Sequence, residues 1–157
     1  MIYPSLQERL KNQHTAIPSI IEQLNERELH YHPEPGKWSI HDNIAHLAKY
    51  QSIFLGRIGM ILTTDEPSFE RYRADDDHGF HIWRNFSTGK LLEKIAAERE
   101  NIYEKITSLP EEQLRRTGNH PRYGKLTIAE WTEFFLLHEA HHLFTIFKLA
   151  HRGEGES

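Results

Sequence analysis

The chain of 157 residues is 38% hydrophobic and 27% charged, proportions typical of one folded domain with its own core. Its formal net charge of −4 at pH 7, with lysine and arginine scattered along the chain, argues against a nucleic-acid partner. No stretch approaches the roughly 18 apolar residues of a membrane span, and the amino terminus lacks signal-peptide features. We therefore expect a cytoplasmic protein that acts on a small molecule, with no nucleic-acid or membrane partner.

Cysteine is absent, which excludes disulfides, thiolate metal ligands and a cysteine nucleophile. Histidine, aspartate and glutamate are then the strong candidates for binding a metal. The 12 histidines raise the chance of metal chemistry without locating it.

The first predicted helix covers residues 5–24, where apolar residues recur at mostly helical spacing. Pro18 lies inside this stretch and must kink or interrupt the helix, because proline has no backbone N–H to donate. Residues 31–36 contain two prolines and a glycine, which predicts a rigid connection.

The second predicted helix begins after Ser39, which is followed by Asp42 in the pattern of a capping box. An apolar stripe then continues to an expected end near Leu62. Residues 63–88 hold Pro67 and an acidic run without a sustained period. A connection of this length is usually functional or mobile.

The third predicted helix is capped by Ser87 or Thr88 and ends before Pro110. A second capping box, Thr127 with Glu130, starts the fourth helix, expected over residues 128–151. Residues 111–125 are expected to form a polar connection and residues 152–157 a frayed tail. Nothing alternates convincingly with period two. We therefore predict an all-α, four-helix bundle with a long crossover connection between helices 2 and 3, formed by a single domain of residues 1–151.

Two histidines on the fourth predicted helix, His138 and His142, are neighbours on its surface because they are four residues apart. Their helical stripe is apolar and faces inward, and His46 lies on the corresponding stripe of the second helix. We predict that His46, His138 and His142 bind one divalent metal ion, for which zinc, nickel, copper and iron all accept imidazole ligands. The alternative is three ordinary core histidines, each satisfied by a hydrogen bond.

The same segment matches the His-Glu-x-x-His pattern of zinc proteases, in which the glutamate is a general base. Thr145 and Lys148 stand where the metzincin extension has glycine and histidine, and no strand is expected to align a peptide. The pattern therefore does not predict a protease. Glu139 and His141 fall off the axis of the stripe, where they would support the ligands or face solvent.

Other polar residues support smaller expectations. Asn43 and Tyr50 lie one turn either side of His46, where they would orient ligands, line a pocket or pack. His78 and His81 follow an acidic run, and for this loop a solvated connection is favoured over a cation site. The remaining histidines have no partner pattern and are taken as ordinary: His14, His30, His32, His41, His120 and His151.

The chain resembles the DinB/YfiT-like family of metal-binding four-helix bundles. The resemblance rests on Lys37-Trp38-Ser39 before the second helix, on His46-Leu47, and on the spacing of His138 and His142. It implies three inward histidines on a divalent metal, open coordination positions and a homodimer. It also implies thiol-dependent transferases or isomerases that use bacillithiol, mycothiol or glutathione, or metal-dependent hydrolases.

The expected function is a metal-dependent enzyme, with low-molecular-weight thiol S-transfer as the first choice and a thiol cosubstrate. The alternatives are hydrolysis at the same site and a non-catalytic metal-binding stress-response module. Zinc, nickel or iron are the expected ions. Because a ligated imidazole is neutral, stabilisation by metal is expected above the unfolded histidine pKa of about 6.5 and should be lost as pH falls.

Overall fold

The computed structural model describes residues 2–152, so the predicted tail lies outside the described residues from position 153 onward. Four long helical limbs form the bundle. The first limb is interrupted and the other three are continuous: α1 (Pro4–Asn12), η1 (Gln13–Thr15) and α2 (Ala16–Ile21), then α4 (Ile40–Thr63), α6 (Thr88–Ser108) and α8 (Ile128–Ala150). The all-α, four-helix bundle is therefore confirmed.

The helix starts follow from their capping residues. Ser39 accepts a hydrogen bond from the backbone N–H of Asp42, and the Asp42 side chain returns the contact to the Ser39 N–H. Thr127 and Glu130 repeat this reciprocal arrangement before α8. Both capping boxes predicted from the sequence are confirmed, and each satisfies backbone N–H groups that the helix itself leaves free.

The irregular middle of the first limb has its cause in Pro18. Proline offers no N–H to the carbonyl four residues earlier, at His14, and the chain tightens there into the short 3-10 turn η1. The predicted interruption is confirmed, although it falls before the proline.

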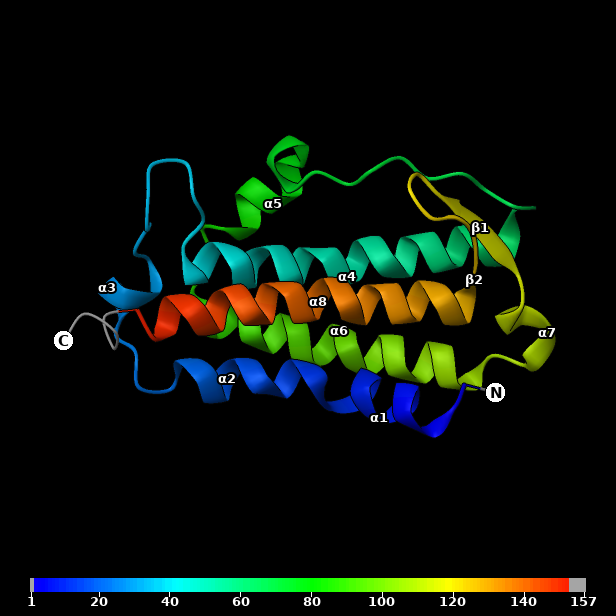
Figure 1. The fold of residues 1–157 in the computed structure, drawn as a ribbon, viewed down its shortest axis with the longest axis horizontal. Helices are drawn as coiled ribbons and strands as arrows, with labels where there is room; N and C mark the ends of the chain where they lie inside the picture. The colour runs from blue at the N-terminus through cyan, green and yellow to red at the C-terminus, as the bar shows by residue number, and fades with distance from the viewer. Residues whose placement is uncertain (1, 153–157) are drawn as a thin grey trace.

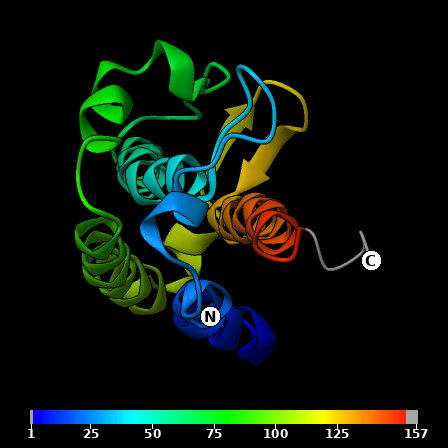
Figure 2. The ribbon, with the colours of Figure 1, turned by 90° about the vertical axis from the view of Figure 1, so that its left-hand side faces the viewer.

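The limbs pack in a square. α4 contacts α6 and α8, and the first limb contacts α6 and α8, so α4 lies diagonally across from the first limb. Figure 2 shows these four limbs nearly end-on. α4 and α6 run in the same direction, so the connection between them returns along the length of the bundle (Figure 1). It carries η2 (Ala74–Asp76) and α5 (His78–Trp83), and α5 packs on α4.

Residues 111–125, expected to form a polar connection, contain regular elements that the sequence did not predict. They contain α7 (Glu111–Leu114) and the start of an antiparallel hairpin of β1 (Thr117–His120) and β2 (Gly124–Thr127). Ser68 in the long connection adds a parallel bridge to Asn119. The Trp131 indole donates to the carbonyl of Gly118, which anchors β1 on α8. The short helix α3 (Glu26–Leu29) was also not predicted.

The core carries one charged pair among its apolar side chains. Arg99 of α6 is 1% exposed and Glu139 of α8 is 2% exposed, and the two form an ion pair. Gln51 accepts a hydrogen bond from Arg99, and Gln13 donates one to Glu139. Among residues 2–152, no helix is both long and apolar enough to cross a membrane.

Candidate metal centre

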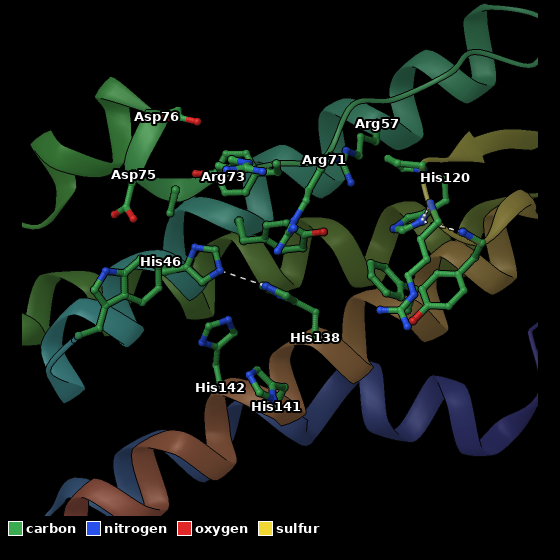
Figure 3. A pocket seen from close by; sticks show the side chains of 18 residues that line it. His46, Arg57, Arg71, Arg73, Asp75, Asp76, His120, His138, His141 and His142 are labelled. Carbon is green, nitrogen blue, oxygen red and sulfur yellow. Dashed lines mark hydrogen bonds between the residues drawn. The ribbon is translucent and has the colours of Figure 1, made fainter. Parts of the chain in front are cut away.

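Three histidines converge on the α4–α8 side of the bundle. One ring nitrogen from each of His46, His138 and His142 lies within 4.8 Å of the others. The Nε2 atoms of His46 and His138 are 3.0 Å apart. Figure 3 shows the three rings turned toward a common point. The structure therefore brings together the three residues singled out from helical periodicity.

The polar groups of this cluster fit a metal ion. His46 and His138 share one contact through Nε2, and both buried Nδ1 atoms have no hydrogen-bond partner. Two neutral imidazoles that face each other can satisfy only one lone pair between them. A tetrahedral ion with bonds of about 2.0–2.1 Å would separate its ligand atoms by roughly 3.4 Å. That separation lies between the 3.0 Å that separates the Nε2 atoms of His46 and His138 and the 4.8 Å limit within which all three donors lie.

Asn43 fixes the orientation of His142. The amide nitrogen of Asn43 donates to the Ser39 carbonyl at 2.8 Å, so its oxygen faces Nδ1 of His142 at 2.9 Å and accepts from it. The His142 proton therefore sits on Nδ1, which leaves the Nε2 lone pair free for a metal. Metal-binding histidines are commonly oriented by such a second hydrogen bond. Asn43 thus orients the His142 ring, one of the roles considered for it, and the role of that ring as a metal ligand stays a prediction.

The surroundings of the cluster are aromatic. The ring of Tyr50 lies 4.1 Å from that of His138, and the ring of Trp38 lies 5.1 Å from that of His46. Burial lowers the pKa of His46 to about 3, that of His138 to about 2 and that of His142 to about 4, with neighbouring histidines as a smaller cause. The three imidazoles are thus neutral near pH 7, the state that binds a metal.

A pocket of about 870 Å³ opens beside the histidines. It lies between α4, α8, the long connection and the hairpin, and its size is within the range of small-molecule sites. The long connection lines it through residues 71–76. Tyr72 is held there because its hydroxyl donates to Asp77 at 2.6 Å.

Several pocket residues were not predicted from the sequence. His120 was taken as ordinary, yet it lines the pocket from the hairpin, and His141 lines it from α8. Trp38 was noted only as part of a family motif. Four arginines also line the pocket, and no sequence pattern links them because they come from three separate segments.

Glu139 cannot act as the base that a His-Glu-x-x-His protease would need. Its side chain is buried against Arg99 in the core and is absent from the residues that line the pocket. It was expected to support the ligands or face solvent, and the structure corrects this. Burial raises the pKa of Glu139, and the Arg99 charge opposes that shift.

The fold and the site together define a class of protein, a four-helix bundle in which two adjacent helices present three inward histidines beside a pocket. The chain matches the family model of the DinB superfamily over residues 9–146, and it belongs to that superfamily. The resemblance drawn from its motifs is therefore confirmed.

Two curated relatives are similar over most of their length. "Uncharacterized protein YuaE" of Bacillus subtilis is 26% identical over 132 residues, which cover 76% of this chain and 82% of the relative. "Putative metal-dependent hydrolase OB0413" of Oceanobacillus iheyensis is 28% identical over 127 residues, which cover 78% and 70%.

A solved structure shares the fold. YfiT from Bacillus subtilis, described as a probable metal-dependent hydrolase with an unusual four-helix bundle topology, aligns with a TM-score of 0.77. The alignment covers 94% of this chain and 85% of YfiT at 17% identity, a level at which the likeness concerns the fold alone.

Proposed function

We propose that the protein is a metal-dependent enzyme in which His46, His138 and His142 hold one divalent ion. The observation that carries the proposal is the convergence of three neutral imidazole donors at the wall of a pocket. Bound there, a divalent ion would lower the pKa of a thiol or water and so supply a nucleophile near pH 7. Asn43 holds His142 in the tautomer that this requires.

Thiol S-transfer is the reaction we favour for this site. A thiol with a pKa of about 8.5 needs a far smaller shift than water, at 15.7, to be a nucleophile near pH 7. Glu139 is held by Arg99, so the motif glutamate is not available to deprotonate water. The chain has no cysteine, so the thiol would come from a low-molecular-weight cosubstrate.

Hydrolysis at the same site is the second candidate, supported by the names of the relatives. The third is a non-catalytic metal-binding stress-response module. Homodimeric assembly and a cytoplasmic location stay predictions.

Metal content tests the proposed ligands directly. Protein purified without a histidine tag is expected to carry close to one divalent ion per chain by elemental analysis. The double variant His46→Ala/His142→Ala should carry almost none, because one imidazole alone cannot hold the ion. His78→Ala is the matched control, since His78 is exposed and does not line the pocket. Metal that persists in the double variant would refute the assignment.

Turnover separates the three candidates. Metal-loaded protein is incubated with bacillithiol, glutathione or coenzyme A and an aryl halide electrophile. In the expected reaction a sulfur–carbon bond forms, halide leaves and the thiol proton passes to solvent. His138→Ala should abolish this turnover. If esters or amides are cleaved and no thiol reacts, the hydrolase replaces our proposal. If neither reacts and four protein groups bind the ion, the non-catalytic module replaces our proposal.

A further inference from the structure

A second part of the pocket is lined by arginines from three separate segments. Arg57 comes from α4, Arg71 and Arg73 come from the long connection, and Arg122 comes from the turn of the hairpin. Figure 3 shows Arg71 directed into the pocket toward His138, with Arg57 and His120 farther along the same wall. The chain as a whole is acidic, with a formal net charge of −4, so this gathering runs against its overall charge.

No carboxylate of residues 2–152 forms an ion pair with any of these arginines. Arg57 donates to the carbonyl of Glu70 at 2.9 Å, and its guanidinium lies 5.6 Å from the centre of the Trp131 ring. Arg122 lies over Tyr123. Within residues 2–152, the side chains of Arg71 and Arg73 form no hydrogen bond, ion pair or ring contact.

Some arginines elsewhere in the fold do have carboxylate partners. Arg9, Arg84 and Arg99 each form an ion pair with a carboxylate. The pocket also holds Asp75 and Asp76, but neither pairs with an arginine of the described chain, and the lining residues keep an excess of two positive charges.

His120 adds an uncharged donor to this wall. Its Nδ1 accepts hydrogen bonds from the backbone N–H groups of Arg122, at 3.0 Å, and Tyr123, at 3.2 Å. The ring proton must therefore sit on Nε2. Burial, helped by the charges of Arg57 and Arg122, lowers the pKa of His120 and keeps the ring neutral. The Nε2–H group is thus left to donate to a ligand.

We propose that this wall, which we call the arginine wall (Arg57, Arg71, Arg73, Arg122 and His120), binds an oxyanion group of the substrate, a carboxylate or a phosphate. Guanidinium groups bind both anions through paired N–H donors. The inference rests on the proposed function for its chemistry, because the rest of the bound molecule would reach the three histidines. Arg57 and Arg71 are the central residues, since Arg57 is half-buried and Arg71 projects into the pocket.

Binding of simple probes tests the wall independently of turnover. The dissociation constants of benzoate, phenyl phosphate and neutral benzamide are measured by calorimetry on the purified protein. Either anion should bind more tightly than benzamide, and its affinity should weaken as salt is raised. The tighter of the two anions identifies the group as carboxylate or phosphate. Equal affinity for the anions and for benzamide would overturn the proposal.

Variants then locate the binding. Arg71→Gln and Arg57→Gln should each raise the dissociation constant of the preferred anion about tenfold, the loss of one charge-assisted contact. Arg27→Gln is the matched control, because Arg27 is exposed on α3 and outside the pocket. Unchanged affinity in the double variant Arg57→Gln/Arg71→Gln, with the fold intact by its melting temperature, would refute the arginine wall.

His138→Ala separates this proposal from the proposed function. It should lose turnover and keep anion binding. If the wild-type protein shows no turnover while anion binding depends on Arg57 and Arg71, the enzyme proposal fails and the arginine wall stands. If turnover is found while anion binding is the same in the arginine variants, the arginine wall fails and the enzyme proposal stands.

Discussion

Metal-loaded protein is expected to melt about 5–10 °C higher than chelated protein at pH 8, and to keep this advantage down to about pH 5. Free metal at a hundred times its dissociation constant adds about 2.7 kcal/mol to the free energy of unfolding. The melting temperature of a domain of this size rises by about 2–4 °C per kcal/mol. The folded pKa values of His46, His138 and His142, about 3, 2 and 4, leave these proposed ligands free of protons until the pH approaches 4.

The sign of the overall pH dependence follows from the unfolded state. Unfolded histidines take up protons below about pH 6.5, whereas the buried ones do not. The stability that depends on their neutral form is therefore present above pH 6.5 and is lost as pH falls toward the folded pKa values. Each buried histidine should remove up to about 1.4 kcal/mol per pH unit from the free energy of unfolding, in metal-loaded and chelated protein alike.

Thermal melts between pH 8 and pH 4, with and without chelator, check this expectation. Both curves should fall below pH 6.5 and stay separated until about pH 5. The sequence alone predicts that metal stabilisation is lost near the ordinary histidine pKa. Burial in an aromatic pocket lowers the pKa of these histidines, so the loss is expected at lower pH. A gap that closes between pH 7 and pH 6 would mean that the ligands titrate as exposed histidines do.

The sequence was sufficient for those parts of the molecule that depend on local periodicity. Ser39 and Thr127 cap their helices through contacts within four residues, and the predicted boundaries held to within a residue or two. His138 and His142 share a face because both lie on one continuous helix, and His46 follows because α4 is amphipathic and packs on α8.

The missed parts depend on contacts between distant segments. The strands β1 and β2 are four residues each and mostly polar, so their pairing leaves no alternating apolar pattern. The anchor for β1 is Trp131, thirteen residues further along the chain. Arg71 and Arg122 reach one pocket only because the long connection bridges to the hairpin between Ser68 and Asn119.

Glu139→Gln is expected to destabilise the protein strongly while leaving the metal centre intact. The change leaves the Arg99 guanidinium buried without a counter-charge, and breaking a buried ion pair from one side costs about 3–5 kcal/mol. A loss of this size lowers the melting temperature of a domain of this length by about 10 °C. Denaturant unfolding and thermal melts measure the effect.

Glu133→Gln is the matched control on the same helix. Glu133 pairs with Arg9 at 2.8 Å, but both side chains are about a third exposed or more, so the change should cost under about 1 kcal/mol. Metal content and turnover per folded molecule should be unchanged in both variants below their melting temperatures. A general base would show the opposite pattern, because Glu139→Gln would then abolish turnover with little loss of stability. Glu139 is buried on the side of α8 away from the pocket, so its role is structural. His138 and His142, on either side of it in the sequence, line the pocket.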